Sequence, residues 1–289
     1  MYDGVINVLK PPGMTSHDVI GYLRRVLQMK KIGHSGTLDP DAAGVLVVYL
    51  GKATRLIEYA GEERKAYYAE LTLGYMTDTA DDSGKIIKTS SIKELTREEI
   101  NDVLKSFTGL QEQVPPMYSA VRYQGKKLYE LARKGLEVER KAREINVYEL
   151  EAVYYGLDYL LLRIVCSKGT YIRTLCEDIA EAFGMCGTVS FLLRSLSGGF
   201  LLSEAKSLAE IAKEPEACLL GLDTAVTSLP KFTLTDNQAL RLSQGVITSV
   251  NGLEENQLYS LYTEQKTFIG IARAENSKLK PEKIINPFY

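Results

Sequence analysis

The sequence predicts an α+β fold with two domains. Strand-like and helix-like segments alternate along most of the chain, whereas after Pro230 there is one short helical segment, DNQALRLSQG, followed by short strand-like runs between polar turns. The length of 289 residues is close to the size at which single hydrophobic cores stop growing. We therefore expect a main domain over residues 1–230 and a small β-rich domain over residues 231–289.

The composition is that of an ordinary globular chain, with 45% hydrophobic and 25% charged residues. The N-terminus has no signal-peptide pattern, and no run reaches the roughly 20 apolar residues of a membrane span. We therefore expect a cytoplasmic protein without membrane contact. The four cysteines include no C-x-x-C pair, and only two histidines are present. The sequence thus predicts reduced thiols and no metal site.

The N-terminal third predicts two strands and two helices. GVINVLKPPG is a short strand stopped by two prolines and a glycine. Thr15 can cap a following helix whose apolar residues recur at helical spacing. Further along, GVLVVYLG is an apolar run of strand length, and ATRLIEYA is a short helix.

The middle of the chain predicts two further strands and two capped helices. In AYYAELTLG the residues alternate, which places Tyr67 on the apolar side of the strand. Thr96 opens a capping-box helix that we expect to end at Gly109. After the strand DYLLLRIVC, Thr170 can cap the helix YIRTLCEDIAEAFG, which puts Arg173 in its first turn.

Asp39 is the strongest candidate for a functional residue. It lies in GHSGTLDPDAAGVL, where Gly33, Gly36 and Gly44 let the backbone approach another group closely. Pro40 pushes the residue before it into an extended conformation, which fixes the direction of the carboxylate. An ordinary Asp-Pro turn is the alternative, but the context favours a carboxylate that faces a ligand.

Arg173 follows Lys168 and Gly169 at a predicted helix N-terminus, which is a positive locus. Such a locus suits either an ionised carboxylate or a phosphate. A pair of Asp39 with Arg173 would supply an unprotonated carboxylate at neutral pH. The sequence leaves open whether the two side chains meet.

Tyr67 and His34 each allow a structural and a functional interpretation. Tyr67 is a core residue or a platform that stacks on a base removed from its helix. His34, between small residues, should lie on a mobile exposed loop, where it contacts a partner or is simply solvated.

Two charged segments complete the candidates. Between Arg122 and Arg143, cations that include Lys126 and Lys127 are interleaved with tyrosines. This pattern fits an RNA backbone, although a solvated helix face explains it as well. The acidic DTADDSG lacks the ligands of a calcium loop at two positions, so we expect a solvated loop. Because the net charge is −2, any nucleic-acid contact must be local.

Five ordered motifs make the chain resemble the TruB-type tRNA pseudouridine synthases. They are NVLKPPGMTSHDV, GHSGTLDPDAAGVL, KAYYAELTLG, PPMYSAVRYQGKKLYELARKG and CSKGTYIRTL. The resemblance extends to about residue 230 and, more weakly, to a C-terminal PUA-like barrel. It implies a mixed, largely antiparallel sheet in the catalytic domain and a basic RNA-binding insertion around residues 115–143.

The resemblance also implies roles for individual residues. Asp39 would be the catalytic aspartate, Tyr67 would pack on the flipped base, and Arg173 would pair with the carboxylate. The remaining implied contacts are with the uracil (Tyr171, Leu192), with the rearranged loop bases (His34) and with the catalytic loop (Lys10, Pro11). The chain departs from the usual pattern at Leu193, where a second arginine is common, and at Asp41 and Ala43.

The implied activity is isomerisation of uridine 55 in the T-loop of tRNA, by a monomer without metal or cofactor. The bond from N1 to C1′ breaks, the uracil turns, and C5 joins C1′, with Asp39 acting as nucleophile or as base. A tRNA-folding chaperone with the same binding surface is the alternative. A glycosidase is less favoured, because Asp39 and Asp41 share one turn and cannot flank a sugar from both sides.

Overall fold

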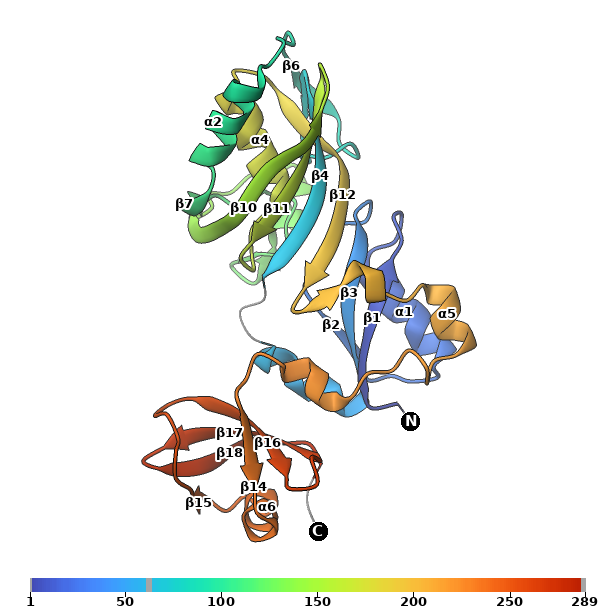
Figure 1. Cartoon of the computed structure of the whole chain (residues 1–289). Coiled ribbons are helices and arrows are strands. Elements are labelled where there is room, and N and C mark those ends of the chain that lie inside the picture. The colour runs from blue at the N-terminus through green and yellow to red at the C-terminus, as the bar shows by residue number, and fades with distance from the viewer. Residues whose placement is uncertain (1, 61–63, 287–289) are drawn as a thin grey trace.

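A mixed sheet of nine strands organises most of the chain in the computed structural model, which describes residues 2–60 and 64–286 (Figure 1). Its path is β1-β3-β12-β4-β11-β10-β7, with β2 added to β3 and β13 to β12. All its neighbours are antiparallel except β3 and β12, which confirms the predicted mixed, largely antiparallel sheet. The strands are β1 (Gly4–Lys10), β2 (Ile32–Ser35), β3 (Ala43–Leu50), β4 (Lys65–Leu73), β7 (Gly109–Gln113), β10 (Arg143–Tyr155), β11 (Tyr159–Cys166), β12 (Gly187–Ser197) and β13 (Phe200–Leu201).

The sheet has two halves with separate cores. Around β1 and β3, α1 and α5 cover one face, while η1 and η3 cover the other. Around β4, β10 and β11, α2 and α4 pack on one face (Figure 1). The helices are α1 (Ser16–Val26), α2 (Arg97–Ser106), α3 (Leu128–Ala132), α4 (Ile172–Ala182), α5 (Leu208–Lys213), η1 (Gly51–Tyr59), η2 (Leu202–Glu204) and η3 (Leu222–Val226). Two small hairpins project from these layers, β5 (Tyr75–Thr77) with β6 (Ile86–Thr89) and β8 (Arg122–Tyr123) with β9 (Lys126–Lys127).

The junction of the halves depends on one glycine. Gly44 in β3 has a φ of +111°, and a Cβ there would lie 2.2 Å from the carbonyl oxygen of Arg194 in β12. Only a residue without a side chain allows this approach. The parallel pairing of β3 with β12 at Gly44 and Arg194 therefore joins the two halves.

Local sequence signals explain most helix starts. Thr15 and Thr96 are the caps of α1 and α2, each within a capping box, as predicted. The expected end of α2 was wrong: the helix ends at Ser106, and Gly109, with φ of +103°, begins β7.

The expected cap of α4 was also wrong. Tyr171, not Thr170, is the N-cap, and the Thr170 hydroxyl donates instead to the carbonyl of Ser167 at 3.0 Å. The side chain of Gln113 in β7 accepts the backbone N–H of Tyr171 at 2.8 Å and donates to its carbonyl at 3.0 Å. The helix start is thus held by a neighbouring strand, and Arg173 does lie in its first turn.

The C-terminal β-rich unit is a curled sheet in the order β14-β16-β17-β18-β15 (Figure 1). Its elements are β14 (Lys231–Leu234), α6 (Asp236–Ser243), β15 (Thr248–Ser249), β16 (Leu258–Thr263), β17 (Phe268–Glu275) and β18 (Lys278–Ile284). Phe268 and Ile271 from this sheet share a core with Val5 of β1 and with Ala53 of η1. In the described part of the chain, no helix is long and apolar enough to span a membrane.

Candidate active site

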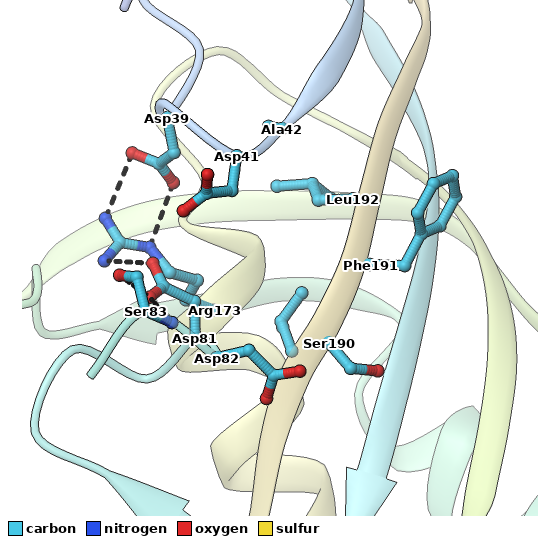
Figure 2. A pocket seen from close by; sticks show the side chains of 11 residues that line it. Asp39, Asp41, Ala42, Asp81, Asp82, Ser83, Arg173, Ser190, Phe191 and Leu192 are labelled. Carbon is cyan, nitrogen blue, oxygen red and sulfur yellow. Dashed lines mark hydrogen bonds and ion pairs between the residues drawn. The ribbon is translucent and has the colours of Figure 1, made fainter. Parts of the chain in front are cut away.

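A cavity of about 230 Å³ lies beside β12, where the two halves of the sheet meet (Figure 2). Arg173 of α4 and four aspartates line it, and Leu192 of β12 supplies an apolar wall. The aspartates come from two loops, which are far apart in sequence: Asp39, Asp41, Asp81 and Asp82.

Arg173 forms an ion pair with Asp39 (Figure 2). Its Nε lies 3.0 Å from Oδ2 of Asp39, and its Nη2 donates to Oδ1 at 3.2 Å. The remaining N–H groups donate to Asp81 and to the carbonyls of Thr79 and Tyr118. A guanidinium has five N–H donors, and here every one of them has a partner. Arg173 therefore has no donor left for a phosphate and serves to hold carboxylates.

Two opposing effects act on the Asp39 carboxyl. Burial raises its pKa, although 37% of the side chain is open to the cleft, while the Arg173 guanidinium lowers it. The nearby Asp81 raises it again. The direction is upward, so this carboxyl takes up a proton at a higher pH than an ordinary aspartate.

Lys10 fixes the loop that carries Asp39. The side chain is fully buried, and its Nζ donates to the carbonyls of Pro11, Pro40 and Ala42 at 2.9, 2.8 and 2.6 Å. Burial lowers the pKa of Lys10 to about 8. Lys10 therefore ties Pro11 to the loop that carries Asp39 through direct hydrogen bonds.

Two further buried side chains hold the same loop. Ser16 accepts the backbone N–H of Leu38 at 2.9 Å and donates to its carbonyl at 3.2 Å. Arg194 is fully buried and donates to the carbonyls of Gly36 and Val45. Arg194 thus connects β12 to the loop before Asp39 and to β3.

Tyr67 is buried and lies on the apolar side of β4, as predicted. Burial raises its pKa to about 12, although the nearby Arg194 guanidinium acts to lower it, so the phenol stays neutral. Tyr67 thus lies near the arginine that donates to the Gly36 carbonyl in the loop before Asp39.

The acidic segment predicted to be a solvated loop is part of the site. Asp81 pairs with Arg173 at 3.3 Å, and its Oδ1 accepts from the hydroxyls of Thr79 and Ser83 at 2.8 and 2.5 Å. A backbone bridge to Val189 fixes the segment on β12. The signal in the sequence was the cluster of small hydroxyl residues around Asp81, which can fix a carboxylate.

His34 is not on an exposed mobile loop. It lies in β2, opposite Val48 of β3, and is only partly exposed. Burial lowers its pKa, and its Nδ1 is a buried atom without a hydrogen-bond partner. The strand formed because Ile32, two residues earlier, packs in the core under α1.

The remaining predicted residues do not all reach the cavity. Leu192 lines it, whereas the ring of Tyr171 lies outside, with the Arg143 guanidinium 4.5 Å from its centroid. Lys126 and Lys127 belong to the separate β8–β9 hairpin, and Lys127 lies 5.4 Å from the centroid of the Tyr129 ring.

The site has no arrangement typical of a metal centre. Across residues 2–60 and 64–286, no group of three or more His, Cys, Asp or Glu side chains is placed to hold an ion. All four cysteines are buried and unpaired. Of the four carboxylates that line the cavity, Asp39 and Asp81 are paired with Arg173.

Comparisons with known proteins agree on one family. The TruB family pseudouridylate synthase N-terminal domain matches residues 24–172, and the C-terminal domain of pseudouridine synthase II TruB matches residues 230–285. Proteins named tRNA pseudouridine synthase B are similar over nearly the whole length. The one from Caldanaerobacter subterraneus is 44% identical, covering 98% of this chain and 99% of that protein. One from Clostridium perfringens, strain SM101, is 41% identical, with the same coverage.

Two solved structures share the fold. A Cbf5-Nop10-Gar1 complex has a chain that matches with a TM-score of 0.77 and 26% identity, covering 98% of this chain and 85% of that one. An H/ACA RNP bound to a substrate RNA containing 2′-deoxyuridine matches with a TM-score of 0.76, 25% identity and the same coverage. The matched domains, the near-complete relatives and the shared fold agree: the chain belongs to the TruB family of pseudouridylate synthases.

Proposed function

We propose that the protein converts uridine 55 in the T-loop of tRNA to pseudouridine, as a monomer, and that Asp39 starts the reaction. The broader activity, isomerisation of uridine in tRNA to pseudouridine, follows from the family. The observation that supports the role of Asp39 is its carboxylate, held on two oxygens by Arg173 in a cavity with an apolar wall.

Asp39 can act in either of two ways. As a nucleophile, its free carboxylate electron pair attacks C1′, and the uracil leaves with the bonding electrons of N1. As a base, it removes a sugar proton, and the elimination releases the same uracil anion. On the first route the uracil turns and its C5 displaces the Asp39 carboxylate from C1′; on the second, C5 adds to C1′ of the unsaturated sugar and the sugar carbon takes its proton back from Asp39. C5 then loses its proton to a base, and N1 takes up a proton. No water enters the product, so the site must exclude it.

Arg173 and the loop anchors prepare this step. The guanidinium favours the ionised form of Asp39 against the effect of burial. Lys10 and Ser16 restrict the loop to one geometry, which keeps the carboxylate aimed at the sugar. Leu192 and Tyr67 are the apolar and aromatic surfaces beside which we place the flipped uracil.

RNA contacts must offset the cost of flipping, which is a few kcal/mol. We assign them to the basic insertion around residues 115–143, with Lys126 and Lys127, and to the PUA-like domain over 231–289. We assign a further contact with the loop bases to His34, but not the expected uracil contact to Tyr171, because its ring lies outside the cavity against Arg143.

The test uses tRNA transcript tritiated at uracil C5, incubated with the wild type and with Asp39→Asn. We expect the wild type to release tritium from one T-loop uridine. The variant should bind tRNA within about twofold of the wild type but release tritium more than about 10³-fold more slowly.

Other outcomes would change the proposal. Release from a different uridine would contradict the T-loop assignment, and turnover by Asp39→Asn would remove its chemical role. Binding without release by the wild type would favour the tRNA-folding chaperone. Free uracil in the medium would indicate a glycosidase.

A further inference from the structure

Four cations form a separate cluster at the end of α1 and in the turn that leads to β2. They are Arg24, Arg25, Lys30 and Lys31, and all are exposed. With Gln28 and Met29, three of them border an open hollow of about 570 Å³. We call them the α1 basic cluster. It lies outside the cavity of Asp39 and outside the basic insertion around residues 115–143.

The α1 basic cluster is not neutralised. Residues 19–38 contain no aspartate or glutamate. In the part of the chain that the structure describes, none of the four cations forms an ion pair. The Arg24 side chain donates to the carbonyl of Ile32 at 3.1 Å. Arginines in the last turn of a helix interact favourably with the helix dipole. This interaction does not explain Lys30 and Lys31, which lie beyond the end of α1.

The position of the cluster relates it to the cleft. Ser16 at the start of α1 is bonded to Leu38, the residue before Asp39. The helix has 11 residues, so its far end is about 16 Å from that loop. A base that enters the cleft cannot reach so far. The cluster can therefore contact only a part of the RNA outside the flipped nucleotide.

The other side of the cluster is tied to the C-terminal unit. The carbonyl of Lys31 accepts the N–H of Gly51, the first residue of η1, at 2.9 Å. Ala53 and Leu56 of η1 share a core with Phe268 of the C-terminal sheet. The α1 basic cluster thus lies between the cleft and the C-terminal sheet.

We infer that the α1 basic cluster binds the sugar-phosphate backbone of the tRNA stem that continues from the loop in the cleft towards the C-terminal sheet. The inference rests on the proposed function. Unpaired cations at this distance suit phosphates rather than base edges, since phosphate contacts position a duplex without reading its sequence.

The test is the triple variant R25Q/K30Q/K31Q, which spares Arg24 because of its bond to Ile32. The matched control is K88Q/R97Q/K105Q, which removes three exposed cations from β6 and α2. The measurements are the tRNA Kd as a function of KCl concentration and the single-turnover rate at saturating enzyme.

We expect the slope of log K against log[KCl] to become shallower by about 2 in the triple variant, and the Kd to rise about tenfold in low salt. The control should show neither change, and the saturating rate should stay within about twofold of the wild type in both. An unchanged slope, or an equal change in the control, would overturn the inference.

A second substrate separates stem from loop contacts. A hairpin with the loop intact but the stem shortened should bind the wild type and the triple variant equally. If the variant still binds this hairpin more weakly, the cluster contacts the loop and the inference is wrong. Failure of the wild type to release tritium from a T-loop uridine would instead contradict the proposed function, whatever the Kd values are.

Discussion

The Asp39 loop and the basic segment over residues 122–143 are both connections with little regular structure, but they are held very differently. Three side chains that are at most 1% exposed, Lys10, Ser16 and Arg194, bind the backbone of the Asp39 loop from β1, α1 and β12. The basic segment is a two-strand hairpin and a helix of five residues.

The basic segment is anchored chiefly at its base. Leu128 and Leu131 are buried, and the N–H of Leu128 donates to the carbonyl of Val121 at 2.8 Å. Most of its cations, such as Lys126 and Arg133, are exposed. The difference fits the proposed roles, because bond cleavage needs one fixed geometry, whereas binding of a phosphate backbone needs charge at a suitable distance and tolerates motion.

Among changes that leave Asp39 in place, loosening its loop should give the largest effect. In Lys10→Met, three carbonyls lose a buried donor, and unsatisfied buried carbonyls cost free energy unless the loop moves. A displacement of about 1 Å can cost about 10²-fold in rate. We therefore expect the single-turnover rate to fall about 100-fold, with the tRNA Kd unchanged.

Rapid-quench tritium release and fluorescence anisotropy measure the two quantities for Lys10→Met. Lys88→Met, at an exposed position in β6, is the control and should change neither. A thermal unfolding curve shows whether the variant is folded. A folded Lys10→Met with a normal rate would mean that the buried lysine does not position the loop.

The comparison also explains what the sequence predicts well. Local patterns gave the caps of α1 and α2 and the buried side of β4 that carries Tyr67. The same kind of pattern pointed to Asp39, because glycines and a proline act on the backbone next to them. These signals are local, so a single sequence contains them.

The contacts that were missed join residues far apart in the sequence. Arg173 binds Thr79 and Asp81, more than 90 positions away, and Gln113 holds the start of α4 across 58 positions. The sequence around Asp81 does not distinguish it from a solvated acidic loop residue. The Thr170 hydroxyl could equally cap α4 or bond to the carbonyl of Ser167, as it does. Their partners are chosen by the sheet order, which periodicity does not determine.

The pH profile of activity should distinguish the titration of the Asp39 carboxylate on the acidic limb from that of Lys10, which holds the loop, on the basic limb. On each limb the rate should change by about tenfold per pH unit. As the pH is lowered, Asp39 takes up a proton and activity falls. Because the pKa of Asp39 is raised, this fall should begin at a pH above the ordinary titration range of aspartate. Because burial lowers the pKa of Lys10 to about 8, activity should also fall above about pH 8, where the neutral amine has too few N–H groups for three carbonyls.

For each of these two groups, the contribution to folding stability increases in the pH range where the activity is expected to fall. The folded state binds the Asp39 proton more tightly than the unfolded state, so protonation as pH falls favours folding. Lys10 loses its proton more easily when folded, so stability rises from about pH 8 towards the ordinary lysine pKa. The titration of these two groups therefore does not unfold the protein on either limb. Lys10→Met should lose the basic limb, and a limb that persists in it would belong to the substrate.

Removing charge from the basic segment should give the smallest of these effects. In K126Q/K127Q, neither the hairpin turn at Gly125 nor the buried leucines change. Each lost phosphate contact should reduce the slope of log K against log[KCl] by about 0.7 to 0.9. We expect the Kd for tRNA to rise about fivefold and the rate at saturating enzyme to stay constant. R97Q/K105Q, with the same charge change on α2, should bind as the wild type does. If instead K126Q/K127Q lowered the saturating rate, the segment would take part in positioning the base, and its light anchoring would have to tighten when RNA binds.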